Sequence, residues 1–166
     1  MKIYYREKSG GIEILRCFGI EGRVEIPGMI DGRLVISAAP YAFSSHMDEK
    51  EELKNASLWE VSDGLGFGRE EHVLAGNDVE EIVFPDTLKE IGRYIFYGCG
   101  NLKKLEFSDS LMQIGCGAFT GCHALEKLAE KTGGLSKVRG IGIGAPNGNY
   151  YTGTIENAVN LVWGGG

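Results

Sequence analysis

The stretch "GRYIFYGCGNLKKLEFSDSL" (Gly92–Leu111) decides the fold, because its rhythm returns in "CGAFTGCHALEKL" (Cys116–Leu128). Phe96 and Phe119, for example, lie 23 residues apart. At this offset, apolar residues, turn residues and cysteines of one copy fall on the same kind of residue in the next: Val79, Ile82, Phe84, Asp86, Leu88, Ile91, Gly92, Phe96, Gly98 and Cys99 fall on Leu102, Leu105, Phe107, Asp109, Leu111, Ile114, Gly115, Phe119, Gly121 and Cys122. The chain therefore contains an internal repeat, which constrains the fold more than any other feature.

Each repeat has the pattern of a short strand followed by turns. Ile82 and Phe84 alternate with outward residues, which is the period of a strand with one buried face. Pro85 ends the strand. Phe96 and Cys99 then point inward from an irregular or single-turn helical arc. One unit cannot bury its own apolar face, but copies stacked as parallel strands about 4.8 Å apart can do so.

A degraded copy precedes these two. "NASLWEVSDGL" (Asn55–Leu65) aligns with "DVEEIVFPDTL" (Asp78–Leu88), again 23 residues further on. Trp59 and Val61 take apolar places of the strand. Before this copy lies an insertion, "MDEKEELK", in which Asp48 and Glu51 have the spacing of a capping box and predict a short solvated helix.

The full pattern, L-x-x-L-x-F-x-D-x-L-x-x-I-G-x-x-A-F-x-G-C-x-x-L, resembles the leucine-rich repeat of the BspA type. The segment Gly10–His46 resembles the N-terminal unit of that family, and Ala42 and Phe43 match its alanine–phenylalanine pair. It departs from the family where Ala39 replaces a glycine and where His46 replaces a cysteine. The resemblance implies a short curved solenoid used for protein interaction, and it implies no catalytic residues.

We therefore predict an α/β fold that is rich in β-structure, namely a short right-handed leucine-rich-repeat solenoid of about four rungs. Irregular or short-helical arcs should form its convex side, and Phe43, Phe96 and Phe119 should stack inside. The parallel ladder is expected through Val24–Ile26, Trp59–Val61, Ile82–Phe84 and Leu105–Phe107. The predicted organisation is a repeat domain 1–128, with an N-terminal unit 10–46, a helical insertion 47–54 and repeats 56–78, 79–101 and 102–124, followed by 129–166 as a glycine-rich C-terminal cap or partly ordered tail.

The composition excludes several classes of function. The chain has 166 residues, of which 43% are hydrophobic and 24% charged, as in an ordinary globular domain. Its net charge of −6 is poorly suited to neutralising phosphates, so we expect no nucleic-acid partner. The N-terminus lacks the apolar core of a signal peptide, and no stretch approaches the roughly 20 apolar residues of a membrane span. We expect a cytoplasmic protein, or a surface protein if the chain is a fragment.

Cysteines and histidines give no catalytic or zinc pattern. Cys99 and Cys122 occupy equivalent repeat positions and should be small buried hydrophobes and free thiols, although stacked copies would not prevent a bridge. Cys116 occupies a variable position and should be more reactive. The histidines are scattered without the spacing of metal ligands. We expect no cofactor, no metal and no enzymatic activity.

Two further patterns have an ordinary interpretation beside a functional one. Asp63, Asp86 and Asp109 occupy the same position in successive copies. We favour a role in the turns for them over a role as cation ligands. Gly140, Gly142 and Ala145 match the literal G-x-G-x-x-A nucleotide fingerprint, but no buried strand precedes them and too little chain follows. A loop or terminal cap is the favoured interpretation of the tail, and its last apolar residues fit either a helix or a closing strand.

The remaining prediction concerns partner binding. Outward strand positions are not needed for packing and line up in columns on one face; they are Arg23, Glu25, Glu60, Glu81, Val83, Lys104, Glu106 and, in the final partial copy, Lys127. We predict a polar protein contact centred on Glu81, Val83, Lys104 and Glu106. Glu81 should pair with Lys104 across neighbouring strands. The alternative is a plain solvated sheet face. The sequence thus favours a non-catalytic protein–protein interaction or scaffold module over a surface-adhesin fragment of the same family, and over a small nucleotide-binding protein that uses the tail.

Overall fold

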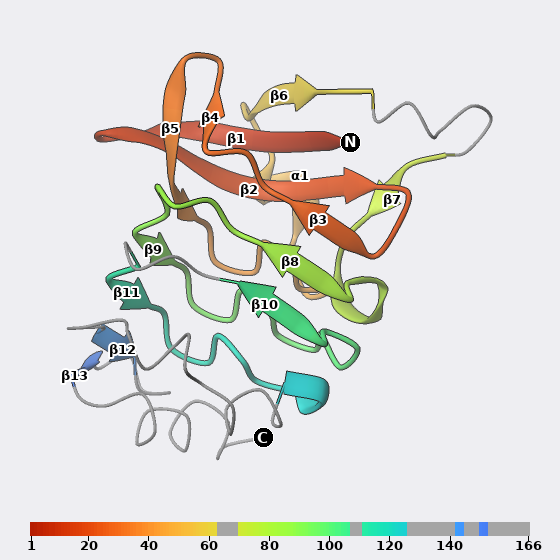
Figure 1. Cartoon of the computed structure of the whole chain (residues 1–166), viewed down its shortest axis with the longest axis vertical. Helices are drawn as coiled ribbons and strands as arrows, with labels where there is room; N and C mark the ends of the chain where they lie inside the picture. The colour runs from red at the N-terminus through yellow and green to blue at the C-terminus, as the bar shows by residue number, and fades with distance from the viewer. Residues whose placement is uncertain (63–69, 107–110, 126–141, 145–149, 153–166) are drawn as a thin grey trace.

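Short strands dominate the computed structural model, which describes residues 1–62, 70–106, 111–125, 142–144 and 150–152 (Figure 1). The strands are β1 (Lys2–Lys8), β2 (Gly11–Gly19), β3 (Arg23–Glu25), β4 (Met29–Ile30), β5 (Arg33–Ala38), β6 (Ser57–Glu60), β7 (His72–Val73), β8 (Glu81–Val83), β9 (Glu90–Ile91), β10 (Lys104–Glu106), β11 (Gln113–Ile114), β12 (Gly142–Gly144) and β13 (Tyr150–Thr152). The helices are a one-turn α1 (Glu49–Glu52) and two 3-10 turns, η1 (Gly76–Asp78) and η2 (His123–Leu125). The protein is β-rich, as the sequence predicts.

The first parallel ladder consists of β3, β8 and β10, in that spatial order. Val24 lies opposite Ile82, which lies opposite Leu105, and all three side chains are buried. Their neighbours along each strand point outward, because successive side chains of a strand alternate between its faces. These are three of the four predicted ladder strands, and the register between the repeats is the one that the 23-residue offset predicts.

The fourth predicted ladder strand, Trp59–Val61, is not in this ladder. Instead β6 pairs antiparallel with β1, so that Trp59 lies opposite Ile3, and β3 pairs directly with β8. The prediction was wrong because the degraded copy lacks residues that would pack it between neighbouring repeats. Leu58 and Val61 are 43% and 44% exposed. Trp59 still packs on the core, but it does so from the edge that β1 offers.

A second ladder runs beside the first and is mixed rather than purely parallel. β5, β9, β11 and β12 pair in parallel, and β2 joins β5 in the same sense. The N-terminal hairpin β1–β2 and the strand β6 add antiparallel pairs at one end, and β13 adds one at the other. Figure 1 shows the hairpin across one end of the stacked repeats and β12–β13 at the opposite end. Hence antiparallel strands flank the repeats on both sides.

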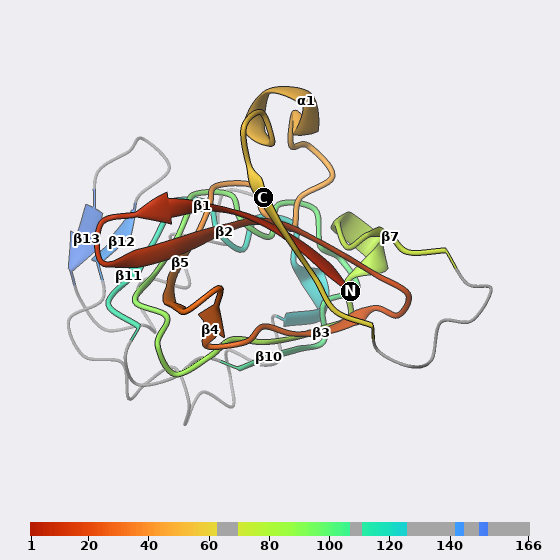
Figure 2. The ribbon, with the colours of Figure 1, turned by 90° about the horizontal axis from the view of Figure 1, so that it is seen from above.

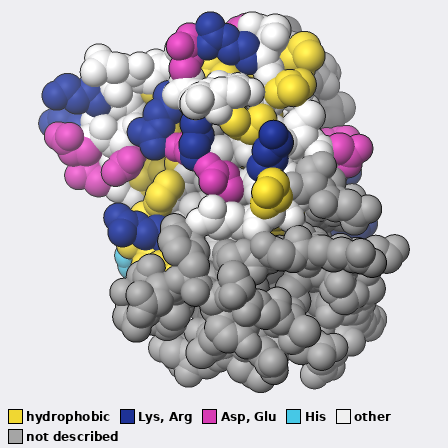
Figure 3. Space-filling model, turned by 90° about the vertical axis from the view of Figure 1, so that its left-hand side faces the viewer, with side chains coloured by type: hydrophobic (Ala, Val, Ile, Leu, Met, Phe, Trp, Pro, Cys, Tyr) yellow, Lys and Arg dark blue, Asp and Glu magenta, His cyan; other side chains and the backbone are white. Residues whose placement is uncertain are grey.

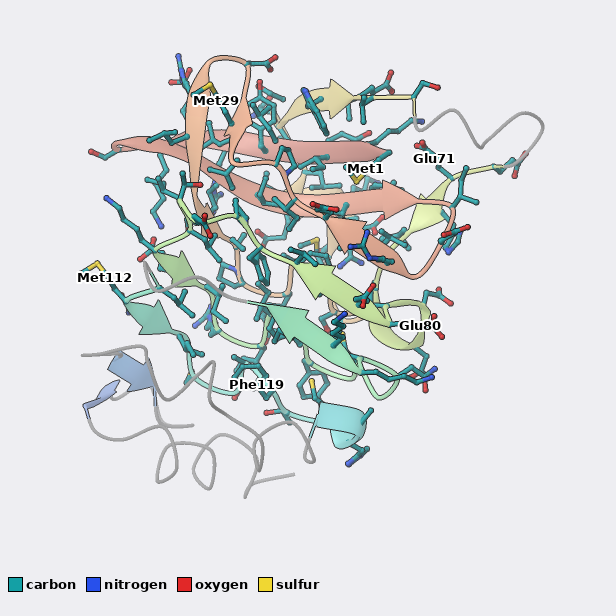
Figure 4. All side chains as sticks on the ribbon, in the orientation of Figure 1. Met1, Met29, Glu71, Glu80, Met112 and Phe119 are labelled. Atoms are coloured by element: carbon teal, nitrogen blue, oxygen red, sulfur yellow. The ribbon has the colours of Figure 1, made fainter. Side chains whose placement is uncertain are left out.

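The aromatic stack predicted inside the repeats is confirmed. The ring centroids of Phe43 and Phe96 lie 5.9 Å apart, those of Phe96 and Phe119 lie 5.6 Å apart, and all three residues are buried. Figure 4 labels Phe119 at the lower end of the packed side chains. The thiol of Cys99 donates a hydrogen bond to the Phe43 carbonyl oxygen, and that of Cys122 donates one to the Phe96 carbonyl oxygen, each 3.2 Å long. The repeat thus recurs in its hydrogen bonds as well as in its sequence.

Glycines allow the backbones of neighbouring repeats to approach closely. A Cβ atom on Gly92 would lie 2.3 Å from the Pro40 nitrogen, and one on Gly115 would lie 2.2 Å from the Arg93 nitrogen. These two equivalent positions therefore require glycine, because no larger side chain fits there. The segments that follow, 39–46, 92–100 and 115–122, form three stacked arcs joined by backbone hydrogen bonds such as Phe96 N to Ala118 O.

The insertion contains α1, whose N-cap is Asp48: its side-chain oxygen accepts a hydrogen bond from the Glu51 amide. Arg16, which is only 2% exposed, fixes the helix by donating from Nε to the Glu49 carboxylate at 3.0 Å. Seen from above in Figure 2, α1 projects from the side of the molecule opposite β3 and β10.

Candidate interaction surfaces

The outward side of the first ladder carries a row of alternating charges, which we call the ladder face and define by Arg23, Glu25, Glu81, Val83 and Lys104. Arg23 Nε lies 2.5 Å from Glu81 Oε2, and Lys104 Nζ lies 3.3 Å from Glu81 Oε1. The predicted Glu81–Lys104 pair is therefore present. Arg23 joins it because β3, rather than the degraded copy, is the neighbour of β8.

These contacts set the charge of the central carboxylate. Desolvation raises the pKa of Glu81, but hydrogen bonds from Lys104 and Arg23 outweigh it and hold the pKa below its ordinary value. Glu81 thus stays ionised between two cations, and positive, negative and positive groups follow one another across three strands. Such a row can recognise a partner that presents the opposite alternation.

The residues predicted for this site divide into three groups. Glu81, Val83 and Lys104 lie together as predicted, and the backbone of Glu106 is in register with Val83 on the same ladder. Glu60, whose copy was expected in the ladder, lies instead on β6 beside Lys2 at 3.9 Å. Lys127, which was expected to continue the column, lies outside the described residues.

A second polar surface surrounds a pocket of about 310 Å³ at the edge formed by β2, β5, β9 and β11. We call it the edge pocket and define it by Lys8, Glu13, Ser37, Glu90 and Arg93. Lys8 Nζ donates to Glu13 Oε2 at 3.0 Å and also pairs with Glu90, while the Ser37 hydroxyl lies within 3.2 Å of both carboxylates. Figure 3, which faces this side, shows basic and acidic side chains interspersed over the described part.

The carboxylate of Glu13 is the most buried charge of this pocket, at 5% exposure. Burial disfavours its charged form, but hydrogen bonds from Arg6 and Lys8 prevail and lower the pKa of Glu13. The pKa of Lys8 is raised, because its bonds to Glu90 and Glu13 outweigh desolvation. No repeat pattern predicts this network, since Arg6, Lys8 and Glu13 belong to the N-terminal hairpin. The signal that could have found it is the alternation of apolar and charged residues around the turn at Gly10.

The described part of the chain places the cysteines and one residue of the nucleotide fingerprint. Cys99 and Cys122 are buried, as predicted, and every described cysteine is a free thiol. Burial raises the pKa of Cys99 to about 12 and raises that of Cys122 as well. Gly142 lies inside the paired strand β12, not in the phosphate-binding turn that a nucleotide fingerprint requires. Asp63, Asp109, Gly140 and Ala145 lie outside the described residues.

Within 1–62, 70–106, 111–125, 142–144 and 150–152, no three His, Cys, Asp or Glu side chains are grouped so that they could hold a metal ion. Over the same residues, no helix has the length and apolarity needed to cross a membrane.

Stacked copies of a strand, a tight glycine turn and an arc with a buried phenylalanine define the class of leucine-rich repeat proteins. In agreement, residues 70–138 match the family described as "BspA type Leucine rich repeat region (6 copies)". This part of the chain is therefore similar in sequence to BspA-type leucine-rich repeats.

Two crystal structures are similar to the chain in fold. One is a leucine-rich repeat protein of T. pallidum, TpLRR, with 24% identity and a TM-score of 0.51, and the match covers 72% of this chain and 43% of that one. The other is a leucine-rich repeat protein from Bacteroides ovatus, with 22% identity and a TM-score of 0.51, covering 86% of this chain and 33% of that one. The chain thus spans less than half the length of either protein. No curated protein matches it in sequence.

Proposed function

We propose that this chain is a non-catalytic interaction module that binds a protein partner through the ladder face and the adjoining Glu106, with the contact centred on Glu81, Val83, Lys104 and Glu106. The observation that carries the proposal is the register of β3, β8 and β10, which holds the outward side chains in fixed rows. The match of residues 70–138 to leucine-rich repeats supports it, because such repeats commonly present extended binding surfaces.

The charges of the ladder face indicate the kind of partner. Arg23 and Lys104 flank Glu81, and both are more than half exposed at their side chains, so their remaining donors face solvent. Val83 is the one apolar member, and none of the five defining side chains is aromatic. We infer a polar contact whose specificity comes from matched charges, rather than an interface built around a large aromatic anchor.

The test exchanges the charges of Glu81 and Lys104, so that the two side chains can still form an ion pair with each other. The double variant Glu81→Lys/Lys104→Glu preserves one ion pair across β8 and β10 but reverses the row that a partner meets. Lys2→Glu/Glu60→Lys, a swap of the exposed pair between β1 and β6, is the matched control. A partner captured from native lysate should bind the control as it binds the wild type and lose most of its binding to the first variant. Unchanged binding to the first variant would show that the contact lies elsewhere.

The setting in which the module works is a separate proposal. An intracellular scaffold and a segment of a surface adhesin of the same family both fit a binding surface of this kind. Fractionation of the native cells followed by immunoblotting distinguishes them. A nucleotide-binding role is disfavoured by the place of Gly142 in β12, and a thermal-shift screen against nucleotides would reveal it as a shift of several degrees.

A further inference from the structure

Strand β6 is the last strand of its sheet and has an open edge. In the described part of the chain it pairs with β1 alone, on one side. Figure 1 shows β6 beyond β1, at the end of the molecule away from β8–β11. Open edges attract further strands, and many proteins protect them with proline, lysine or a bulge. The strand β6 contains neither proline nor lysine, and its register with β1 has no bulge.

The hydrogen bonds between β1 and β6 show which backbone groups face the open edge. The Val61 amide donates to the Met1 carbonyl oxygen at 3.0 Å, so these two residues form a hydrogen-bonded pair. Hydrogen-bonded and non-hydrogen-bonded pairs alternate along antiparallel strands. The backbone groups of Trp59 therefore face β1, whereas those of Leu58 and Glu60 point outward. Within the described residues, these outward amides and carbonyl oxygens have no hydrogen-bond partner.

A second copy of the chain presents the same groups in matching order. When two β6 strands lie antiparallel with Leu58 of one opposite Glu60 of the other, the outward amides and carbonyl oxygens of both strands are all bonded. The arrangement has a twofold axis, so each strand meets an identical surface. Trp59 then lies opposite Trp59 of the second copy in a non-hydrogen-bonded pair, where side chains of neighbouring strands approach most closely.

The other symmetric registers of two β6 strands are less favourable. A pair centred on Glu60 places two carboxylates directly opposite each other, which is destabilising. A pair centred on Leu58 requires the Ala56 amide as a donor, but that amide already donates to the Leu53 carbonyl oxygen at 3.1 Å. In the register centred on Trp59, no charge faces a like charge.

The side chains of β6 also gain from this pairing. Leu58 is an exposed apolar residue, and Trp59 is half-buried. Pairing would remove apolar surface of both from water. The charge of the strand is Glu60, which already lies 3.9 Å from Lys2 of β1, so its carboxylate has a cation beside it in each copy.

We propose that two copies of this chain associate through β6, as an antiparallel pair centred on Trp59 that joins their sheets into one. The occupant of the edge is a second copy, because its own β6 carries unpaired groups at the same spacing and is always present at the same concentration. The contact is short, so the dimer forms weakly and its fraction rises with concentration. This proposal goes beyond the proposed function and uses none of the residues of the ladder face.

Sedimentation velocity over about 5 to 500 μM protein tests this association. The wild type should shift from monomer toward dimer as the concentration rises. Leu58→Pro removes an outward amide without removing a bond to β1, and should weaken the dimer about tenfold or more. Leu58→Glu, which places a carboxylate opposite Glu60 of the second copy, should weaken it similarly. Leu58→Lys, which places an ammonium group there instead, should weaken it much less.

A disulfide tests the register. In a Cys116→Ser background, Trp59→Cys should give a disulfide-linked dimer under mild oxidation, because residues of a non-hydrogen-bonded pair lie within reach of such a bond. Val61→Cys is the matched control. Val61 is also exposed, but the proposed register places it opposite Ser57 of the second copy rather than opposite its own counterpart.

Controls separate this proposal from loss of folding and from failure of the ladder face. Circular dichroism should show Leu58→Pro folded, and Leu58→Glu replaces it if it is not. The swap Glu81→Lys/Lys104→Glu should leave dimerisation unchanged. A monomer over the whole concentration range, or a dimer insensitive to both Leu58→Pro and Leu58→Glu, would overturn the proposal. Equal cross-linking of Val61→Cys and Trp59→Cys would contradict the register. Capture of another protein that depends on Leu58, without self-association, would assign the edge to a strand of that protein instead.

Discussion

Replacing Phe96 tests whether the stacked phenylalanines stabilise the repeats as the structure indicates. Its side chain is fully buried and lies between the rings of Phe43 and Phe119, at 5.9 and 5.6 Å. Truncating a buried phenylalanine to alanine costs about 3–5 kcal/mol, and each lost aromatic pair accounts for about 0.5–1.5 kcal/mol beyond area burial. We therefore expect Phe96→Ala to lower the free energy of unfolding by about 4–5 kcal/mol.

The assay is urea unfolding followed by far-UV circular dichroism. With a slope of about 2 kcal/mol/M, a loss of this size moves the midpoint down by about 2 M, a large part of the stability of an ordinary domain. Phe96→Leu should lose only about 1.5 kcal/mol, because it restores most of the apolar volume. Leu34→Ala, at a position that is 44% exposed, should stay within about 0.5 kcal/mol of the wild type. A loss below about 1 kcal/mol for Phe96→Ala at an unchanged slope would mean that the phenylalanine stack does not stabilise the repeats to this extent.

Three further perturbations test other parts of the structure. Gly115→Ala should destabilise the fold by about 2–4 kcal/mol in the same urea assay, since its Cβ would lie 2.2 Å from a backbone nitrogen, and a neutral effect would contradict the close approach of the arcs. Because the pKa of Glu13 is lowered in the folded protein, its contribution to stability is present above its ordinary pKa of 4.5 and is lost as pH falls through the lower folded value. Glu13→Gln should therefore lower the free energy of unfolding by about 1–3 kcal/mol at neutral pH and by much less in acid. An equal loss at both pH values would count against the network with Lys8. In native protein a maleimide should label the half-buried Cys116 faster than the buried Cys122, whose thiol pKa is raised by burial, and the reverse order would be inconsistent with this fold.

The sequence predicts those parts of the fold that occur in more than one copy of the repeat. Ile82 and Leu105 have the same neighbours in successive copies, so their register follows from the 23-residue offset alone. The stack of Phe96 on Phe119 follows in the same way. The N-terminal hairpin could not be placed by this reasoning, because it occurs once and has no copy to align. Its strand β1 pairs with β6, so the degraded copy is not part of the predicted ladder.

The candidate surfaces follow the same division. The pair of Glu81 and Lys104 was predictable because both lie in well-preserved copies, whereas the contribution of Arg23 depends on which strand neighbours β8. The edge pocket joins Lys8 of the hairpin to Glu90 of a repeat, 82 residues away, and no local pattern specifies such a contact. The stacking of Tyr41 on Tyr94 was not predicted either, because tyrosine at these positions and glycine at the equivalent Gly117 look like a broken repeat until their shared backbone conformation is seen.

Site-specific photo-cross-linking shows directly whether the ladder face contacts a protein partner. A photo-reactive amino acid is placed at Val83, at the middle of the ladder face, or at Leu34 on β5 as an exposed control. After irradiation in native lysate, we expect a discrete protein adduct from position 83 and none from position 34. An adduct from position 34 alone, or none from position 83 at any protein concentration that still gives capture by the unmodified chain, would contradict the claim.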